Sequence, residues 1–215
     1  MKKILLVLII LFFLFKKTNL SAQQVSLFAE VQTTQTGSEL NFSAIPRNYY
    51  AEQWVSVIGK KGNGMYLQCS QEPEAQTLAL GYITSKTFGK NWYVEGGIAP
   101  GLEWDEYEAL AASASCYLYA ENKTDDKRAK GKVTILLNPY YSKSAGVWWQ
   151  GYAMYSVTKW LGVGGFFQTE SAIGPRIQLN LPAGFAPWVA YGLQQKSDGN
   201  LITIGLMWNG GVMPD

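Results

Sequence analysis

Apolar and polar residues alternate along most of this chain, which is the pattern of β-strands whose two faces meet different surroundings. The clearest example runs from residue 173 to residue 181. One side of this segment holds Ile173, Pro175, Ile177, Leu179 and Leu181, and the other holds Gly174, Arg176, Gln178 and Asn180. No stretch after residue 24 has convincing helical spacing, so the pattern predicts an all-β fold.

Twelve segments of this kind are separated by turn residues such as glycine, asparagine and proline. The predicted strands lie near residues 24–32, 48–58, 64–70, 76–86, 91–101, 107–121, 131–139, 146–157, 160–170, 173–182, 185–195 and 199–208. Ten or fourteen strands are the alternatives. The longest predicted connections are 33–47 and 122–130, and the alternating charges of the second indicate a solvated loop. No repeat or linker divides the chain, which favours one domain.

The first 22 residues have the features of a secretory signal peptide. Two lysines follow Met1, an apolar run extends from Ile4 to Phe15, and a polar stretch ends at Ala22. Twelve apolar residues in a helix reach only about 18 Å, which is too short for a hydrocarbon core of about 30 Å. We therefore expect a signal peptide at 1–22 and a β-barrel domain at 23–215, with an uncleaved anchor as the alternative.

Removal of this peptide reverses the net charge of the chain. The whole sequence has 18 basic and 16 acidic residues, and four of the basic residues are lysines of the first 22 positions. The remaining chain has 14 basic and 16 acidic residues, a net charge of −2. Nucleic acid is therefore not an expected partner.

Long stretches have almost no charge on either face, which is unusual for a soluble protein. Between Ala145 and Gln168 the only charged residue is Lys159. Lipid-facing strands need about 9 to 11 residues each, so twelve of them fit the available length. A single antiparallel transmembrane β-barrel therefore explains the composition.

Aromatic residues lie mostly toward the ends of the later strands. They are Trp148, Trp149, Tyr152, Tyr155, Trp160, Trp188, Tyr191 and Trp208. Rings at strand ends are typical of the level of lipid headgroups. We expect that placement here, with packing inside the barrel as the alternative.

Residues 155–167, 174–181 and 188–193 have a strand-turn-strand pattern that resembles the sequences of small, porin-like bacterial outer-membrane β-barrel proteins. The segment 202–208 resembles their closing strand, with its glycine and spaced hydrophobic residues. The resemblance implies an up-and-down transmembrane barrel in the bacterial outer membrane. It also implies two partners, outer-membrane lipid and the barrel assembly machinery.

The chain contains no histidine, which excludes every catalytic or metal site that depends on an imidazole. The S-x-x-K match at Ser156–Lys159 falls at a strand end and turn, where it lacks the helical context of that motif. Glu103, Asp105, Glu106 and Glu108 indicate a solvated acidic loop, with a divalent-cation site as the alternative. We expect no enzyme activity, no cofactor and no metal.

The two cysteines, Cys69 and Cys116, fall on predicted strands that are not neighbours. Free thiols are therefore favoured over a disulfide.

The predicted polar face of the strands points to the lumen. Its candidate residues are Glu30, Glu52, Gln68, Glu95, Tyr117, Tyr119, Gln150, Arg176, Gln178 and Asn180. Charges and hydrogen-bonding groups on such a face can select a small polar or cationic solute. We therefore expect a narrow channel for passive passage of small polar solutes.

Two other functions remain open from the sequence. One is a non-conducting barrel with a structural or surface-interaction role, in which the same polar residues pair with each other. The other is a soluble, secreted lipocalin-like barrel that binds a hydrophobic ligand inside. The soluble barrel requires the opposite polarity, with Ile177 and Leu179 inside and Arg176 and Gln178 in water.

Overall fold

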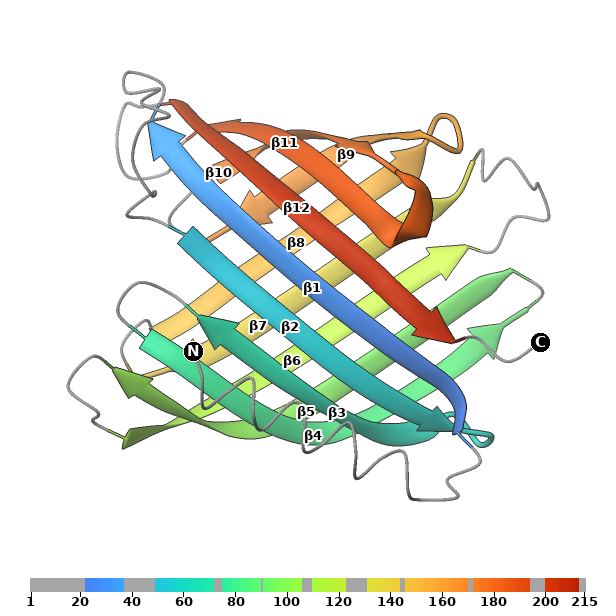
Figure 1. The fold of residues 1–215 in the computed structure, drawn as a ribbon, viewed down its shortest axis with the longest axis vertical. Helices are drawn as coiled ribbons and strands as arrows, with labels where there is room; N and C mark the ends of the chain where they lie inside the picture. Colours follow the sequence, from blue (N-terminus) through green and yellow to red (C-terminus); the bar gives the residue numbers. More distant parts are fainter. Residues whose placement is uncertain are drawn as a thin grey trace.

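The computed structural model describes residues 22–36, 49–71, 75–89, 91–105, 110–122, 131–143, 146–169, 172–193 and 200–212. They form a closed antiparallel β-barrel of twelve strands, each paired with its neighbours in the sequence. The first strand, blue in Figure 1, closes the barrel against the last, which is red. The predicted all-β, up-and-down barrel is confirmed.

The strand bounds follow the alternation of the sequence closely. The first six strands are β1 (Ala22–Thr36), β2 (Tyr49–Gly59), β3 (Asn63–Gln71), β4 (Ala75–Phe88), β5 (Trp92–Asp105) and β6 (Leu110–Asn122). The last six are β7 (Val133–Ser142), β8 (Gly146–Ser156), β9 (Leu161–Gln168), β10 (Ala172–Leu179), β11 (Phe185–Leu193) and β12 (Asn200–Val212). A 3-10 turn, η1 (Pro182–Gly184), joins β10 to β11. None of the described segments is a helix long and apolar enough to span a membrane.

Some of the predicted features lie wholly or partly outside the described residues. Residues 1–21 of the predicted signal peptide are among them, whereas Ala22 is the first residue of β1. Residues 123–130 of the predicted charged loop are also outside the described residues, whereas its first residue, Asn122, ends β6.

The acidic loop predicted around Glu103 is wrong in its first part. Strand β5 continues to Asp105, and the Glu103 side chain is buried inside the barrel. Glu103 pairs with Ala111 of β6 and has the same parity as Glu95 on the same strand. The period of two therefore carries this carboxylate to the interior. Glu106 and Glu108 lie outside the described residues.

The outer face of the barrel is apolar over almost its whole height. Ile98, Ile173 and Ile177 are examples, with exposed fractions of 63%, 55% and 50%. Among strand positions whose side chains the structure describes, Lys86 near the end of β4 is the only charged residue on this face. A surface of this size without charge favours lipid over water.

The soluble, lipocalin-like alternative is wrong on this evidence. It requires Ile177 and Leu179 inside the barrel, yet both side chains are about half exposed on the outer face. Arg176, which that alternative places in water, is 1% exposed in the interior.

The aromatic residues divide between the two faces, so the prediction that they all lie at headgroup level is wrong in part. Trp149, Tyr155, Trp160 and Tyr191 are exposed outside. The rings turned into the barrel are those of Trp148, Tyr152 and Trp188, and Trp148 stacks on Tyr50 at 5.3 Å. Adjacent Trp148 and Trp149 point in opposite directions because successive side chains of a strand alternate.

Large interior rings are accommodated by inward-facing glycines. A Cβ added at Gly97 would lie 2.6 Å from the Tyr66 ring and 2.7 Å from the Tyr117 ring. The two rings meet edge to face at 5.0 Å directly over this position. Gly97 thus provides the space in which they pack.

We expect Gly97→Val to destabilise the barrel by about 1–3 kcal/mol, because its side chain would overlap both rings. The measurement is urea unfolding of the folded protein in detergent, followed by the heat-dependent shift of the barrel on a gel. Gly165→Val is the matched control, since a Cβ there meets only the Gly174 carbonyl oxygen at 4.0 Å. Equal stability of the two variants would contradict this account of the packing.

Candidate functional site

The interior contains a cavity of about 590 Å³ toward the end of the barrel that holds the β8–β9 and β10–β11 turns. Its wall is unusually aromatic, with rings from six strands. They belong to Phe28, Trp54, Tyr66, Tyr93, Tyr117, Tyr119 and Tyr152. The charged residues of the lining are Glu95, Glu121, Lys132 and Lys159. The wall of the cavity is therefore not uniformly polar, because it combines aromatic rings with carboxylates.

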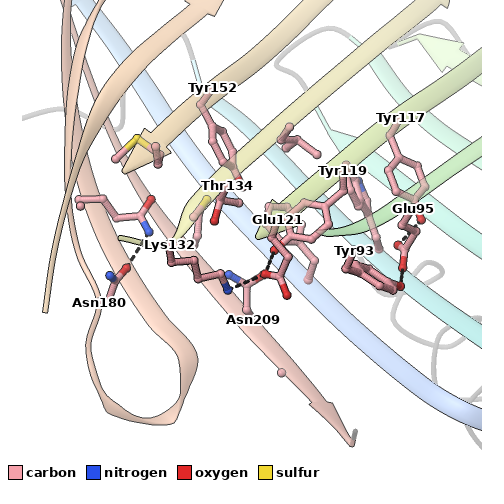
Figure 2. Close-up of a pocket in the computed structure, with 18 of the residues that line it drawn as sticks. Tyr93, Glu95, Tyr117, Tyr119, Glu121, Lys132, Thr134, Tyr152, Asn180 and Asn209 are labelled. Atoms are coloured by element: carbon pink, nitrogen blue, oxygen red, sulfur yellow. Dashed lines mark hydrogen bonds and ion pairs between the residues drawn. The ribbon is translucent and has the colours of Figure 1, made fainter. Parts of the chain in front are cut away.

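Glu95 projects from β5 into this cavity and is held by two phenols (Figure 2). The Tyr117 hydroxyl donates a hydrogen bond to Oε1 at 2.5 Å, and the Tyr93 hydroxyl donates to Oε2. Tyr93 lies two residues before Glu95 on the same strand face, whereas Tyr117 comes from the neighbouring strand β6, where its Cα pairs with Gly97. The carboxylate is 8% exposed, so its position is defined by these two neutral donors.

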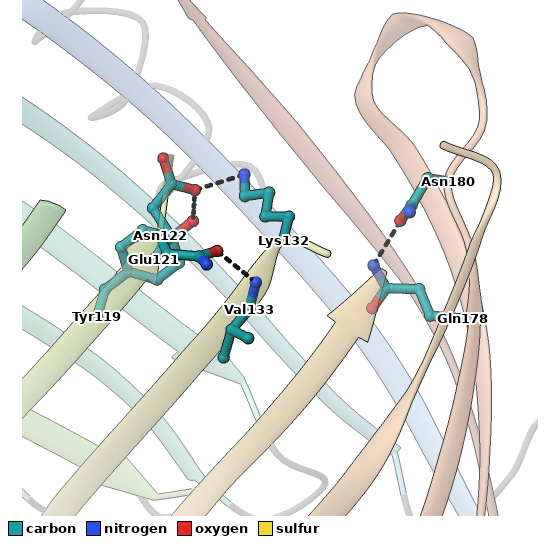
Figure 3. Close-up of polar contacts among 7 residues, drawn as sticks. All are labelled: Tyr119, Glu121, Asn122, Lys132, Val133, Gln178 and Asn180. Atoms are coloured by element: carbon teal, nitrogen blue, oxygen red, sulfur yellow. Dashed lines mark hydrogen bonds and ion pairs between the residues drawn. The ribbon is translucent and has the colours of Figure 1, made fainter. Parts of the chain in front are cut away.

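Glu121 has a different partner, a lysine. Its carboxylate lies 2.5 Å from the Lys132 ammonium and accepts a hydrogen bond of 2.6 Å from the Tyr119 hydroxyl. Asn122 supports the arrangement, because its side-chain oxygen accepts a hydrogen bond from the Val133 amide. Figure 3 shows this group on β6 and β7, and the Gln178–Asn180 amide pair at the end of β10.

Arg176 is a buried cation in the barrel interior beneath this cavity. Its guanidinium lies 4.0 Å from the centre of the Trp188 ring and 4.4 Å from that of Tyr152. One nitrogen, Nη2, donates to the Gln178 side-chain oxygen at 3.0 Å. Electrostatic attraction also couples Arg176 to Glu30. The planar cation is therefore held by rings and by opposite charge.

Two glutamates accept hydrogen bonds from side-chain amides, and in each case one of the amides lies on the far side of the barrel. Asn138 of β7 donates to Glu52 of β2 at 3.0 Å, and Gln68 of β3 donates to the same oxygen. Gln150 of β8 donates to Glu30 of β1 at 3.4 Å. Four strands lie between the members of each cross-barrel pair on the shorter way round the barrel. Together with Arg176, these residues bridge the interior, and we call them the central layer.

Several polar atoms of the central layer have no hydrogen-bond partner among the described residues. They are Glu30 Oε1, Asn138 Oδ1, Gln150 Oε1, Arg176 Nε and Arg176 Nη1. Buried polar atoms are usually hydrogen-bonded to protein or to water. These atoms are enclosed within the layer, so its packing leaves part of its hydrogen-bonding capacity unused.

The structure places all ten predicted lumen residues on the inner face of the barrel. Glu30, Glu52, Gln68, Gln150 and Arg176 belong to the central layer. Glu95, Tyr117, Tyr119, Gln178 and Asn180 line the cavity. Their action on a solute stays a prediction.

Other interior residues were not among the sequence candidates. Glu103 and Glu121 share the parity of Glu95 and Tyr119 on their strands, so the alternation contained the signal. The alternation around Asn138 is less clear, because Leu136, two positions earlier on the same inward face, is apolar. Lys132 lies on the predicted strand 131–139 and has the parity of the inward-facing Thr134 and Leu136, so the alternation contained this signal too, although β7 itself begins at Val133.

Neither cysteine is part of a site. Cys69 and Cys116 are both free, and Cys69 is buried whereas Cys116 is exposed. The prediction of unpaired thiols is confirmed. Among the described residues, no group of three or more potential ligands is placed to hold a metal ion.

Comparison with known proteins gives similarity of structure alone. No protein-family model and no curated protein matches the chain. The KdgM porin superposes with a TM-score of 0.50 and 14% identity, over 85% of this chain and 98% of KdgM. The chain has a porin-like fold.

Two further solved structures superpose on this porin-like barrel with lower TM-scores. The outer-membrane protein Omp33 of Acinetobacter baumannii has 9% identity and a TM-score of 0.44, over 89% of this chain and all of Omp33. The NanC porin has 11% identity and a TM-score of 0.44, over 85% of this chain and 98% of NanC.

Arg176→Lys tests the role of the stacked guanidinium in this porin-like barrel. The variant keeps the charge but loses the planar group between the Tyr152 and Trp188 rings, so we expect a loss of about 1–3 kcal/mol in unfolding free energy. Urea unfolding in detergent measures it, with Lys86→Arg on the outer face as the control. Stability equal to that of the unchanged protein would rule out a stabilising role for the stack.

Proposed function

We propose that this protein is a bacterial outer-membrane channel for the passive passage of small polar solutes, with a preference for cations. One observation carries the proposal, the charge of the interior. The described inner face holds five glutamates, at positions 30, 52, 95, 103 and 121, against Arg176 and the two lysines of the cavity lining, Lys132 and Lys159. An interior with excess negative charge attracts cations and repels anions.

The outer-membrane location is supported by the contrast between the two faces. Apolar side chains cover the outside of a closed barrel, and the backbone polar groups are paired from strand to strand around the whole circumference. A hydrocarbon environment requires both conditions. In this proposal residues 1–22 act as the export signal, the barrel assembly machinery inserts the chain, and outer-membrane lipid surrounds it.

The size of the bore supports a narrow channel. Twelve strands give a diameter between that of eight-stranded barrels, whose interiors are filled by side chains, and that of open sixteen-stranded porins. The cavity of about 590 Å³ occupies one part of the interior, and the central layer crosses another. The cross-barrel hydrogen bonds of that layer narrow the interior, which favours passage of small solutes over large ones.

The similarity of fold to KdgM does not imply that this barrel admits the molecule found with KdgM. A structure of that porin contains disordered oligogalacturonate, an anionic sugar chain, and superposes with the same TM-score of 0.50. The acidic interior of the present barrel is unfavourable for a polyanion. We therefore propose a cationic or neutral small solute instead.

We also propose that the protein has no catalytic activity. The chain contains no histidine, and the proteins KdgM and NanC are porins by name. The polar residues of the interior are engaged in a network that bridges strands.

A non-conducting structural barrel is the second candidate function. The observation in its favour is the central layer, whose hydrogen bonds cross the barrel from β2 to β7 and from β1 to β8. A layer that stays closed would block ions completely. Electrical measurement separates the two functions.

Planar-bilayer recording of the purified, refolded protein tests the channel. We expect discrete conductance steps in potassium chloride. Under a salt gradient, the reversal potential should have the sign of a cation preference, because the interior is acidic. Folded, inserted protein that carries no current would favour the structural barrel, and an anion preference would contradict the charge argument.

Arg176→Ala should increase both the conductance and the cation preference, because it removes a bulky positive group from the central layer. The matched control is Ile177→Ala, whose side chain is on the outer face. The change is measured in the same bilayers as single-channel conductance and reversal potential. A conductance and selectivity unchanged by Arg176→Ala would place the ion path away from this residue.

A further inference from the structure

Glu95 is a buried carboxylate without a basic partner. Its hydrogen bonds come from the neutral hydroxyls of Tyr93 and Tyr117, and no lysine or arginine of the described residues forms an ion pair with it. Charged side chains are rarely buried unless they are paired. Each carboxylate oxygen accepts one hydrogen bond from a phenol, which leaves further lone pairs for another donor. The missing partner is therefore a cation that the cavity itself can admit.

The other charges that line the cavity are already engaged. Lys132 forms its ion pair with Glu121, and the Lys159 ammonium lies 4.7 Å from the centre of the Trp160 ring. Glu95 is thus the carboxylate of the cavity lining that has no ion-pair partner among the described residues.

The wall beside Glu95 consists of ring faces in contact. Trp54 lies between Phe28 and Tyr117, with centroid distances of 4.9 and 4.8 Å. The Tyr66 ring meets Tyr117 edge to face. Aromatic faces attract cations that have lost much of their hydration, and they also pack against alkyl groups.

The barrel already holds one organic cation in this way. The guanidinium of Arg176 stacks on Tyr152 and Trp188, and the Tyr152 ring also lines the cavity. The same two elements, ring faces and a carboxylate within electrostatic reach, recur around Glu95. At Glu95 the cation is not supplied by the chain.

We propose that the cavity binds a small organic cation, a quaternary ammonium or protonated amine, with its charge beside Glu95 and its alkyl groups against Trp54 and Tyr117. The volume of about 590 Å³ is within the usual range of small-molecule sites. The inference rests on the proposed channel, because it names the class of solute that the channel admits. A neutral sugar would use the rings but leave the carboxylate without a counter-charge.

Calorimetric titration of the detergent-folded protein with two molecules of matched shape tests the site. Choline is the cation, and 3,3-dimethylbutan-1-ol is its uncharged analogue. We expect choline to bind at least about tenfold more tightly than the alcohol, and Glu95→Gln to remove about that factor. Glu103→Gln is the matched control, since Glu103 is equally buried but outside the cavity lining, and it should keep choline binding.

A second variant guards against misfolding of Glu95→Gln. Trp54→Leu keeps the carboxylate but removes a ring of the wall. Choline binding should again fall, and by a larger factor than binding of the alcohol, which loses only the contact of its alkyl groups. Folding of every variant is checked by its heat-dependent shift on a gel. Equal affinity for choline and the alcohol, or full choline binding by folded Glu95→Gln, would overturn the proposal. Tighter binding of D-glucose than of choline would also overturn it, in favour of a neutral sugar.

Potassium conductance measured on the same preparation separates this site from the channel. Current in potassium chloride without choline binding would refute the site and leave the channel. Choline binding without current would refute the channel and leave a binding barrel. In a conducting barrel, we expect choline to reduce the potassium current in the unchanged protein and to have at least about tenfold weaker effect in Glu95→Gln. Equal reduction in both would place the site elsewhere.

Discussion

The pairing of every strand with two neighbours is the constraint on which the rest of this structure depends. In hydrocarbon, an unpaired amide or carbonyl costs several kcal/mol, so a sheet with free edges is excluded. The register of β1 on β12 closes the sheet and removes its edges. Once the barrel is closed, alternation sends one side chain to lipid and the next to the interior. The apolar outside and the polar inside are then two consequences of the same backbone geometry.

The interior of a twelve-stranded barrel imposes a second condition, because it is too narrow to leave every charge in bulk water. Its polar groups therefore bind one another, as Asn138 binds Glu52 across the barrel. Arg176 is stabilised by two rings, and Glu121 is stabilised by Lys132. The hydrogen-bond donors to Glu95 are neutral, as they are for Glu52, but Glu95 lies where the packing leaves a cavity. The same side chains that stabilise the interior thus set the charge and the shape of its cavity.

Similarity of fold does not by itself give similarity of solute. The backbone of the KdgM porin superposes over 85% of the chain, although only 14% of residues are identical. Strand number and closure are properties of the backbone, which many sequences can form. Selectivity depends on the inward-facing residues, and here they are predominantly acidic and aromatic. Fold alone is a poor guide to the solute for this reason.

The sequence by itself determined that the chain forms β-strands and the face of most of their residues, because both depend on a local period of two. It left the number of strands open between ten and fourteen. It placed Arg176 and Glu95 on the inner face and Ile177 on the outer face. Which inner residues meet was decided by the tertiary structure. Gln150 and Glu30 are 120 positions apart, and their contact depends on closure and on the stagger of all the intervening strands. The burial of Glu103 depended on where β5 ends, which the turn residues did not reveal. Alternation is a property of neighbouring residues, whereas the division of the interior into a bridged layer and a cavity is a property of the closed barrel.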